Sequence, residues 1–153
     1  MRTYDAAWIK SVITHPKIWP HVADDHAPKP ADFQPILHDG LYYLAPEHDG
    51  QPIGVFFYHP HTRSVYEVHT CVLPEFWGSA ALNGAKAGLR WMVGNTSCLK
   101  VITQVPADNP RARRFALRVG MTDEGTNRAS FLKDGGLLDQ WTLGITKDEI
   151  LCL

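Results

Sequence analysis

Residues 66–93, YEVHTCVLPEFWGSAALNGAKAGLRWMV, change the period of their apolar side chains from that of a strand to that of a helix. The part up to Leu73 is rich in β-branched and aromatic residues, as strands are. From residue 79 the apolar side chains recur at helical spacing, at Leu82, Ala85, Leu89 and Met92. A row of small residues four apart indicates close packing of this helix on the sheet: Ala80, Gly84 and Gly88. The segment therefore predicts a strand, a loop of small residues and a helix.

Three strands are predicted before this helix, because residues 41–46, 52–58 and 65–73 are rich in aromatic and β-branched residues. Their connectors are short and turn-like, which favours an antiparallel meander. Closer to the N-terminus, the sequence predicts helical segments at residues 5–14 and 17–25, followed by a proline-rich loop to residue 35.

After the helix, an alternating pattern predicts a strand at residues 99–105. Asn109 and Pro110 predict the start of another helix, which Gly120 ends. Two more strands are expected at residues 129–133 and 138–144, around the turn Asp134-Gly-Gly. The tail at 147–153 receives no assignment. This order of elements is that of a mixed α+β layer protein.

The composition is that of a single globular domain, with 153 residues, 44% of them hydrophobic and 20% charged. Lys and Arg total 15 against 16 Asp and Glu, so no electrostatic attraction to nucleic acid or an anionic membrane is expected. The N-terminus lacks the layout of a signal peptide and no long apolar run occurs, which predicts a cytoplasmic protein. Three distant cysteines fit neither a disulfide framework nor a metal motif.

The loop VLPEFWGSAA at residues 72–81 resembles the pyrophosphate loop of the GNAT superfamily of N-acetyltransferases. Free N–H groups in a helix's first turn carry partial positive charge, and small residues let a pyrophosphate approach them. The resemblance implies acetyl-CoA as the cofactor, contacted by Gly78, Ser79, Ala80 and Ala81. Glu75 stands where the family has Gln or Arg, and its charge would repel phosphates. The alternative is a loop that only begins a helix.

The helix NPRARRFALRVGM at residues 109–121 is also similar to a GNAT motif, matched by Asn109, Ala112, Phe115 and Gly120. The resemblance implies that Asn109 bonds the pantetheine arm or nearby backbone; the alternative is an ordinary helix N-cap. Arg114, on one face with Arg111 and Arg118, would contact the 3′-phosphate or belong to a solvated basic face. Ala116 replaces a tyrosine that protonates the thiolate in many members. The replacement moves the resemblance toward the subgroup that acetylates ribosomal-protein N-termini and small amines, which often lacks that tyrosine.

The resemblance covers about residues 40–146 and implies a GNAT-like, acyl-CoA N-acyltransferase fold. That fold is an α+β arrangement of a mixed, mostly antiparallel twisted sheet with helices on both faces. Pantetheine inserts between two of its strands, which splay apart. Residues 121–125 and the hairpin after them are similar to the end of the same subgroup's domain. Residues 14–25 are similar to phage-encoded acetyltransferase-like proteins, which suggests an accessory viral gene.

The strand at residues 65–73 carries the candidate catalytic residues. Glu67, His69 and Cys71 share one face because strand side chains alternate. A carboxylate and an imidazole two residues apart can relay a proton, and the resemblance places Glu67 first and His69 second as the base. The backbone N–H of Cys71 or Val72 would stabilise the oxyanion. The alternative is that Glu67 and His69 are satisfied polar groups on a solvated sheet face.

The leading hypothesis is an N-acetyltransferase that transfers acetyl from acetyl-CoA directly to a primary amine of a small molecule or a peptide. The alternatives are the same fold used without catalysis as a binding protein, and a phage virion or host-interaction component. Successive aromatic residues in the meander put apolar groups on both sheet faces, which would suit a homodimer. His59 and His61 lack a third ligand at recognisable spacing, so no metal site is expected.

Overall fold

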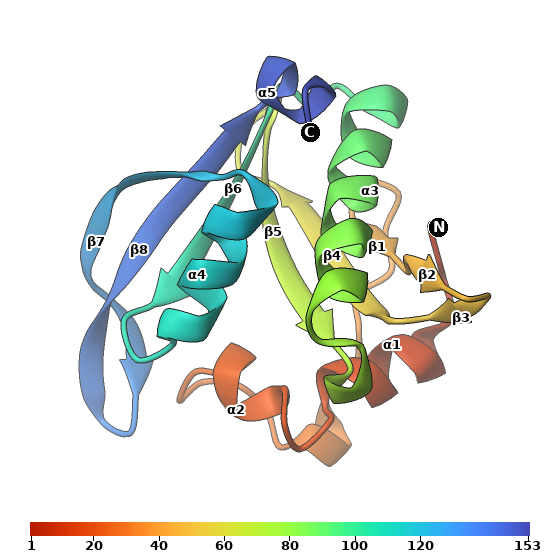
Figure 1. Ribbon diagram of the computed structural model, residues 1–153. Helices are drawn as coiled ribbons and strands as arrows, with labels where there is room; N and C mark the ends of the chain where they lie inside the picture. Colours follow the sequence, from red (N-terminus) through yellow and green to blue (C-terminus); the bar gives the residue numbers. More distant parts are fainter.

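A six-stranded sheet of order β1-β4-β5-β6-β8-β7 forms the centre of the computed structural model, which describes all residues 1–153 (Figure 1). Its strands are β1 Tyr42–Leu44, β4 Gly54–Pro60, β5 Val65–Val72, β6 Lys100–Pro106, β7 Thr122–Lys133 and β8 Gly136–Thr146. Only β5 and β6 run parallel; every other neighbouring pair is antiparallel. A separate hairpin joins β2 Glu47–His48 to β3 Gln51–Pro52. The predicted mixed, mostly antiparallel sheet is confirmed.

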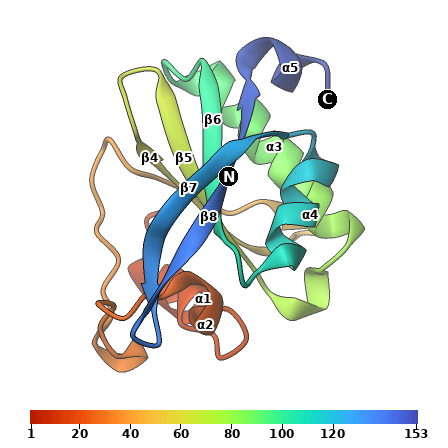
Figure 2. The same ribbon diagram turned by 90° about the vertical axis from the view of Figure 1, so that its left-hand side faces the viewer.

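Helices cover both faces of the sheet, as predicted (Figure 2). The larger core lies under α3 Ser79–Asn95 and α4 Pro110–Val119, and includes residues of β4, β5, β6 and β8. The smaller core lies on the opposite face, where α1 Ala6–Ile13 packs on β4 and β5. Short helical segments are α2 Trp19–Val22, η1 Pro30–Asp32, η2 Pro74–Phe76 and α5 Lys147–Leu151. None of the helices combines the length and the apolar character that crossing a membrane requires.

The glycine row of α3 brings this helix close to the sheet. A Cβ atom added at Gly84 would lie 2.6 Å from Ile53 Cδ1, and one at Gly88 would lie 2.9 Å from the Tyr58 hydroxyl. Ile53 and Tyr58 are both buried, so neither has free space to move into. The close packing predicted from the small residues is confirmed.

The C-terminal part of the chain has more regular structure than predicted. β7 begins at Thr122, not at residue 129, and its pairing with β8 shifts register at Asp123/Gly125 and at Asn127/Phe131. Such irregularities interrupt the alternation of apolar and polar residues, so the pattern shows only the end of the strand. The unassigned tail forms α5, which begins with a capping box between Thr146 and Glu149.

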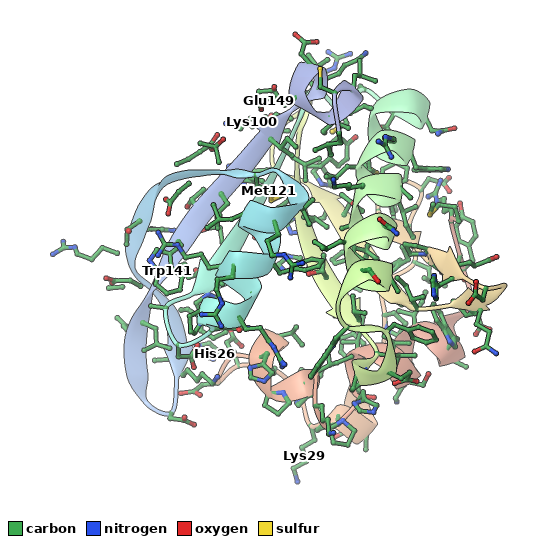
Figure 3. The ribbon with its side chains drawn as sticks, in the orientation of Figure 1. His26, Lys29, Lys100, Met121, Trp141 and Glu149 are labelled. Carbon is green, nitrogen blue, oxygen red and sulfur yellow. The ribbon has the colours of Figure 1, made fainter.

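The side chains around α4 connect it to the β7–β8 hairpin. Met121, directly after α4, is buried in the larger core, and Trp141 of β8 lies beside the helix (Figure 3). The Arg113 guanidinium lies 4.6 Å from the centre of the Trp141 ring and pairs with the Asp123 carboxylate. The face of α4 that carries Arg111, Arg114 and Arg118 lies on the other side of the helix and shares a cleft with α2.

Asp25 attaches the N-terminal segment to the tip of the β7–β8 hairpin. Its carboxylate accepts hydrogen bonds from the backbone N–H groups of Gly135 and Asp134, each 2.8 Å long, and its own N–H donates to Leu132 O. These two N–H groups, Gly135 first, lower the pKa of the Asp25 carboxyl. The link holds the segment that follows α2, and α2 lies below α4 in Figure 1.

Two glycine-to-alanine substitutions in α3 should shift stability in opposite directions. Gly88→Ala should lower the free energy of unfolding by about 1–3 kcal/mol, because the new methyl group meets the Tyr58 hydroxyl. A Cβ atom at position 94 would have open space around it. Gly94→Ala should therefore raise the free energy of unfolding by up to about 1 kcal/mol, because alanine has the higher helix propensity. Urea denaturation of both variants measures the difference, and equal effects would contradict the close approach of α3 to β4.

Candidate active site: a cleft where two strands part

β5 and β6 pair only at their first residues and then separate. Their register runs from Val65↔Lys100 to Glu67↔Ile102, and no residue beyond these pairs across the two strands. At the point of parting, the Thr103 hydroxyl donates a 3.0 Å hydrogen bond to Val68 O. The splayed strands that the GNAT resemblance implied are therefore present.

The hydrogen-bond pattern of β5 decides which backbone groups line the gap. Leu73 N–H donates to Ile53 O, and His61 N–H donates to Val65 O, so the odd-numbered residues of β5 pair with β4. The even-numbered residues Thr70 and Val72 direct their backbone groups toward the gap. Val72 O accepts a 2.9 Å hydrogen bond from Trp77 Nε1. The Val72 N–H faces the same gap as this oxygen. Of the two expected oxyanion donors, Cys71 points its N–H to β4 and only Val72 points into the gap.

The gap opens into a cleft of about 940 Å³, at the upper end of the range for small-molecule sites. Its walls are the diverging ends of β5 and β6, the loop before α3, one face of α4, and the segment around α2. Six of the sequence-predicted site residues line it: His69, Val72, Gly78, Ala81, Asn109 and Arg114. Glu67, Cys71, Ser79 and Ala80 do not line it, and neither does Glu75.

The N-terminus of α3 lies beside this cleft, which Gly78 and Ala81 line. Gly78 precedes the helix with φ of 109° and ψ of −131°, a conformation suited to glycine, and no side chain caps the helix. The first-turn N–H groups of Ser79, Ala80 and Ala81 therefore have no partner within the helix. The exposed Glu75 carboxylate lies in η2, outside the cleft lining. This helix end has the backbone arrangement that binds anions.

α4 contributes an amide and several cations. Asn109 caps the helix, because its side-chain oxygen accepts a 3.2 Å hydrogen bond from Ala112 N–H, so the N-cap interpretation is confirmed. Its amide nitrogen makes no hydrogen bond within the protein and remains available as a donor. The Arg111 guanidinium lies 4.1 Å from the centre of the Trp77 ring and so joins α4 to the loop before α3. The sequence pattern grouped Arg111 with a basic face but did not indicate this contact.

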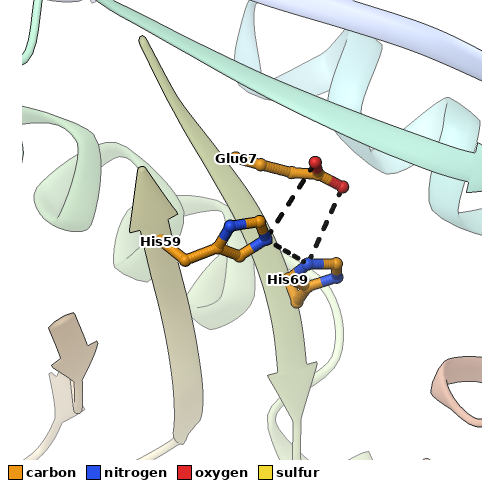
Figure 4. A group of neighbouring side chains, drawn as sticks. All are labelled: His59, Glu67 and His69. Carbon is orange, nitrogen blue, oxygen red and sulfur yellow. Dashed lines mark hydrogen bonds and ion pairs between the residues drawn. The ribbon is translucent and has the colours of Figure 1, made fainter. Parts of the chain in front are cut away.

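Three polar side chains meet on the sheet face opposite α3 (Figure 4). His59 Nε2 and His69 Nε2 lie 3.1 Å apart, and the Glu67 carboxylate lies 3.7 Å from His69 Nε2 and 4.0 Å from His59 Nε2. The ring centroids of the two histidines are 5.2 Å apart, so the rings meet through these nitrogens rather than by stacking their faces. One nitrogen must donate and the other accept, which means that the histidine pair holds one proton between the rings.

His69 connects this cluster to the cleft. Its side chain is 43% exposed and lines the cleft, whereas that of Glu67 is 12% exposed. Desolvation lowers the pKa of His69 against the opposing effect of the Glu67 charge, which favours a neutral imidazole. The predicted shared face of Glu67, His69 and Cys71 is confirmed, although Cys71 belongs to the core under α1.

The sequence analysis missed His59 as a member of this cluster. Its position depends on the β4–β5 register, which sets His59 opposite Glu67 and Phe57 opposite His69. The turn at residues 61–64 and the alternation of both strands together would have indicated the pairing. His59 thus groups with Glu67 and His69 rather than with His61, and one ligand atom from each of these three residues lies within 4.8 Å of the others.

Comparisons with known proteins agree with this architecture. A family model described as a protein of unknown function (DUF2824) matches residues 13–149. A spermidine N-acetyltransferase from Vibrio cholerae, in complex with CoA and spermine, has a similar structure, with a TM-score of 0.76, 15% identity, and coverage of 99% of this chain and 95% of that chain. A GNAT-family acetyltransferase from Bacillus anthracis gives a TM-score of 0.61, 16% identity, and coverage of 71% and 67%. No curated protein matches. The likeness shows the GNAT fold.

Removing the hydroxyl where the strands part should destabilise the protein. Thr103→Val should lower the free energy of unfolding by about 1–2 kcal/mol, since Val68 O loses its donor in a buried position. Thr142→Val is the matched control, because it changes a β8 threonine whose hydroxyl makes no hydrogen bond within the protein. Thermal denaturation compares the two, and a similar stability for both variants would show that the Thr103 bond contributes little.

Proposed function

The chain belongs to the family described as a protein of unknown function (DUF2824) and has the GNAT fold, and on this basis we propose that it is an acetyl-CoA-dependent N-acetyltransferase acting on a primary amine. The observation that carries the proposal is the gap between β5 and β6 that ends at the uncapped N-terminus of α3. A strand-like chain ending in a pyrophosphate is complementary to both features.

The walls of the cleft match the parts of acetyl-CoA in order. The backbone groups of Thr70 and Val72 offer strand-type hydrogen bonds to the amides of pantetheine. The free N–H groups that follow Gly78 receive the pyrophosphate. Arg114 and Asn109 both line the cleft. In this proposal the Arg114 guanidinium binds the 3′-phosphate and the Asn109 amide donates to the pantetheine arm. Acetyl-CoA supplies the activated acyl group as its thioester.

The transfer requires a neutral amine, and an amine in water at neutral pH carries a proton. His69, supported by Glu67, takes this proton at the cleft wall. The amine nitrogen then attacks the thioester carbon, and the Val72 N–H stabilises the negative charge on the carbonyl oxygen. Collapse forms the amide and breaks the carbon–sulfur bond. The attacking nitrogen releases its second proton to water, and because Ala116 carries no acidic group, the departing thiolate takes a proton from water.

The charges near the acceptor end indicate the kind of amine. Lys17 and His21 line the cleft beside α2. Asp108, whose carboxylate pairs with Lys133 at 2.8 Å, is the acidic side chain in the lining. Unpaired carboxylates would strengthen the attraction to a polycation, whereas the cations of Lys17 and the arginines would weaken it. A small or peptide amine with one positive charge therefore fits this cleft better than the spermine bound by the Vibrio cholerae protein.

Acetyl-CoA should raise the melting temperature of the protein, because a ligand that binds only the folded state stabilises it. Ser79→Asp should remove this shift, since the new carboxylate would repel the pyrophosphate. The same change should leave the unliganded protein equally or more stable, because an acidic group suits the first turn of a helix. Ser79→Ala is the control and should keep the shift. No shift with millimolar acetyl-CoA in the unaltered protein would refute the proposed cofactor.

Glu67→Gln should reduce kcat for acetyl transfer by about 10²-fold or more while leaving acetyl-CoA binding unchanged, because the amide cannot support proton acceptance. A coupled assay for free CoA thiol over a panel of amines and peptide N-termini measures the rate. Calorimetry with acetyl-CoA verifies that binding persists. Full turnover in the variant would remove Glu67 from the mechanism. Binding without turnover by the unaltered protein would favour a non-catalytic binding protein of the same fold.

A further inference from the structure

We propose that His59, Glu67 and His69 form a binding site for a divalent first-row metal ion such as Zn²⁺, and that the bound ion blocks proton acceptance at the cleft. The metal site itself does not depend on the proposed acetyltransferase activity. Only the blocking effect rests on it.

The three side chains provide a donor set that Zn²⁺ accepts. Two imidazoles and one carboxylate with an open fourth position for water are a recurrent arrangement around this ion. Ligand atoms about 2.0–2.1 Å from a tetrahedral ion lie roughly 3.3 Å from one another. The observed separations are 3.1 Å between the two Nε2 atoms, and 3.7 and 4.0 Å from these atoms to the carboxylate. Rotations of the two imidazoles that turn their lone pairs away from each other and toward a common point would complete the site.

The sheet holds the ligands in place before any ion arrives. His59 and Glu67 stand opposite each other in the β4–β5 ladder, and His69 follows Glu67 on the same face. The Phe57 ring lies 5.5 Å from the His59 ring and 6.0 Å from the His69 ring, and so limits their movement. Little conformational freedom remains to be lost when a metal binds.

Glu67 supplies the negative charge of the site. Its side chain is 12% exposed, and the nearer histidine nitrogen, His69 Nε2, lies 3.7 Å from its carboxylate, beyond hydrogen-bond distance. The carboxylate can therefore bind a cation placed among the three groups without first breaking a hydrogen bond within the protein. The two histidines are 31% and 43% exposed, so an ion and a water ligand can reach the site.

Occupation of this site would change the cleft. The metal would bind the His69 lone pair that otherwise accepts the proton of the amine. The N-terminus of α3 belongs to another wall of the cleft and has no part in the site. The ion should therefore inhibit transfer while acetyl-CoA still binds.

Titration of the chelator-treated protein with Zn²⁺ tests the site. Isothermal calorimetry should give one ion per chain, and His59→Gln should weaken its binding at least about tenfold. His61→Gln is the matched control, because it alters an exposed histidine two residues away and should bind as the unaltered protein does. All variants carry Cys152→Ser, which removes the one exposed thiol. Equal affinity of the His59→Gln and His61→Gln variants, or no stoichiometric binding, would overturn the proposal.

Co²⁺ gives an independent readout. A tetrahedral site should produce visible absorption that His59→Gln and His69→Asn both abolish and His61→Gln retains. Persistence of the absorption in either cluster variant would place the ion elsewhere and refute the site. Stoichiometric binding to a protein that acetylates no amine when metal-free would support the metal site and count against the proposed enzyme. Acetylation that is unaffected by saturating Zn²⁺ would overturn the blocking effect alone.

Discussion

The separation of β5 from β6 after Glu67 and Ile102 is the constraint on which the rest of the structure depends. Parting two central strands exposes backbone groups that a sheet normally pairs. The chain tolerates this because each strand is paired along its other edge, β5 with β4 and β6 with β8. Each half of the sheet therefore keeps its own ladder, and the unpaired edges become the walls of a cleft.

Side chains bond some of the backbone carbonyl groups that the separated strands leave unpaired. Thr103 bonds Val68 O where the strands part, and Trp77 bonds Val72 O farther along the gap. Trp77 also lies under Arg111, which ties the loop before α3 to α4. On the opposite side, Asp25 attaches the segment after α2 to the tip of the β7–β8 hairpin. The cleft is thus bounded by elements from the beginning, middle and end of the chain.

The pairing of β5 with β4, on the side away from the gap, also assembles the cluster of titratable side chains beside the gap. The register of β4 with β5 brings His59 next to Glu67 and His69, although the strands that carry them are separated by a turn. These three side chains can all accept protons, and of the three only His69 lines the cleft. The same lone pairs can accept a proton or bind a metal ion, and occupation by one excludes the other. Metal binding at the cluster would therefore affect proton acceptance by His69 in the cleft.

The sequence by itself determined the elements whose signals are local. The period change in residues 66–93, the Asn109–Pro110 start and the Gly120 end of α4 predicted those elements correctly, because periodicity and caps act within a few residues. The start of β7 was missed because its register shifts hide the alternation, and α5 was missed although its capping box is readable in the sequence. The membership of His59, the choice of Val72 over Cys71 and the Arg111–Trp77 contact depend on how distant segments pair. Only the tertiary structure decides these, since register and strand separation are properties of the assembled sheet.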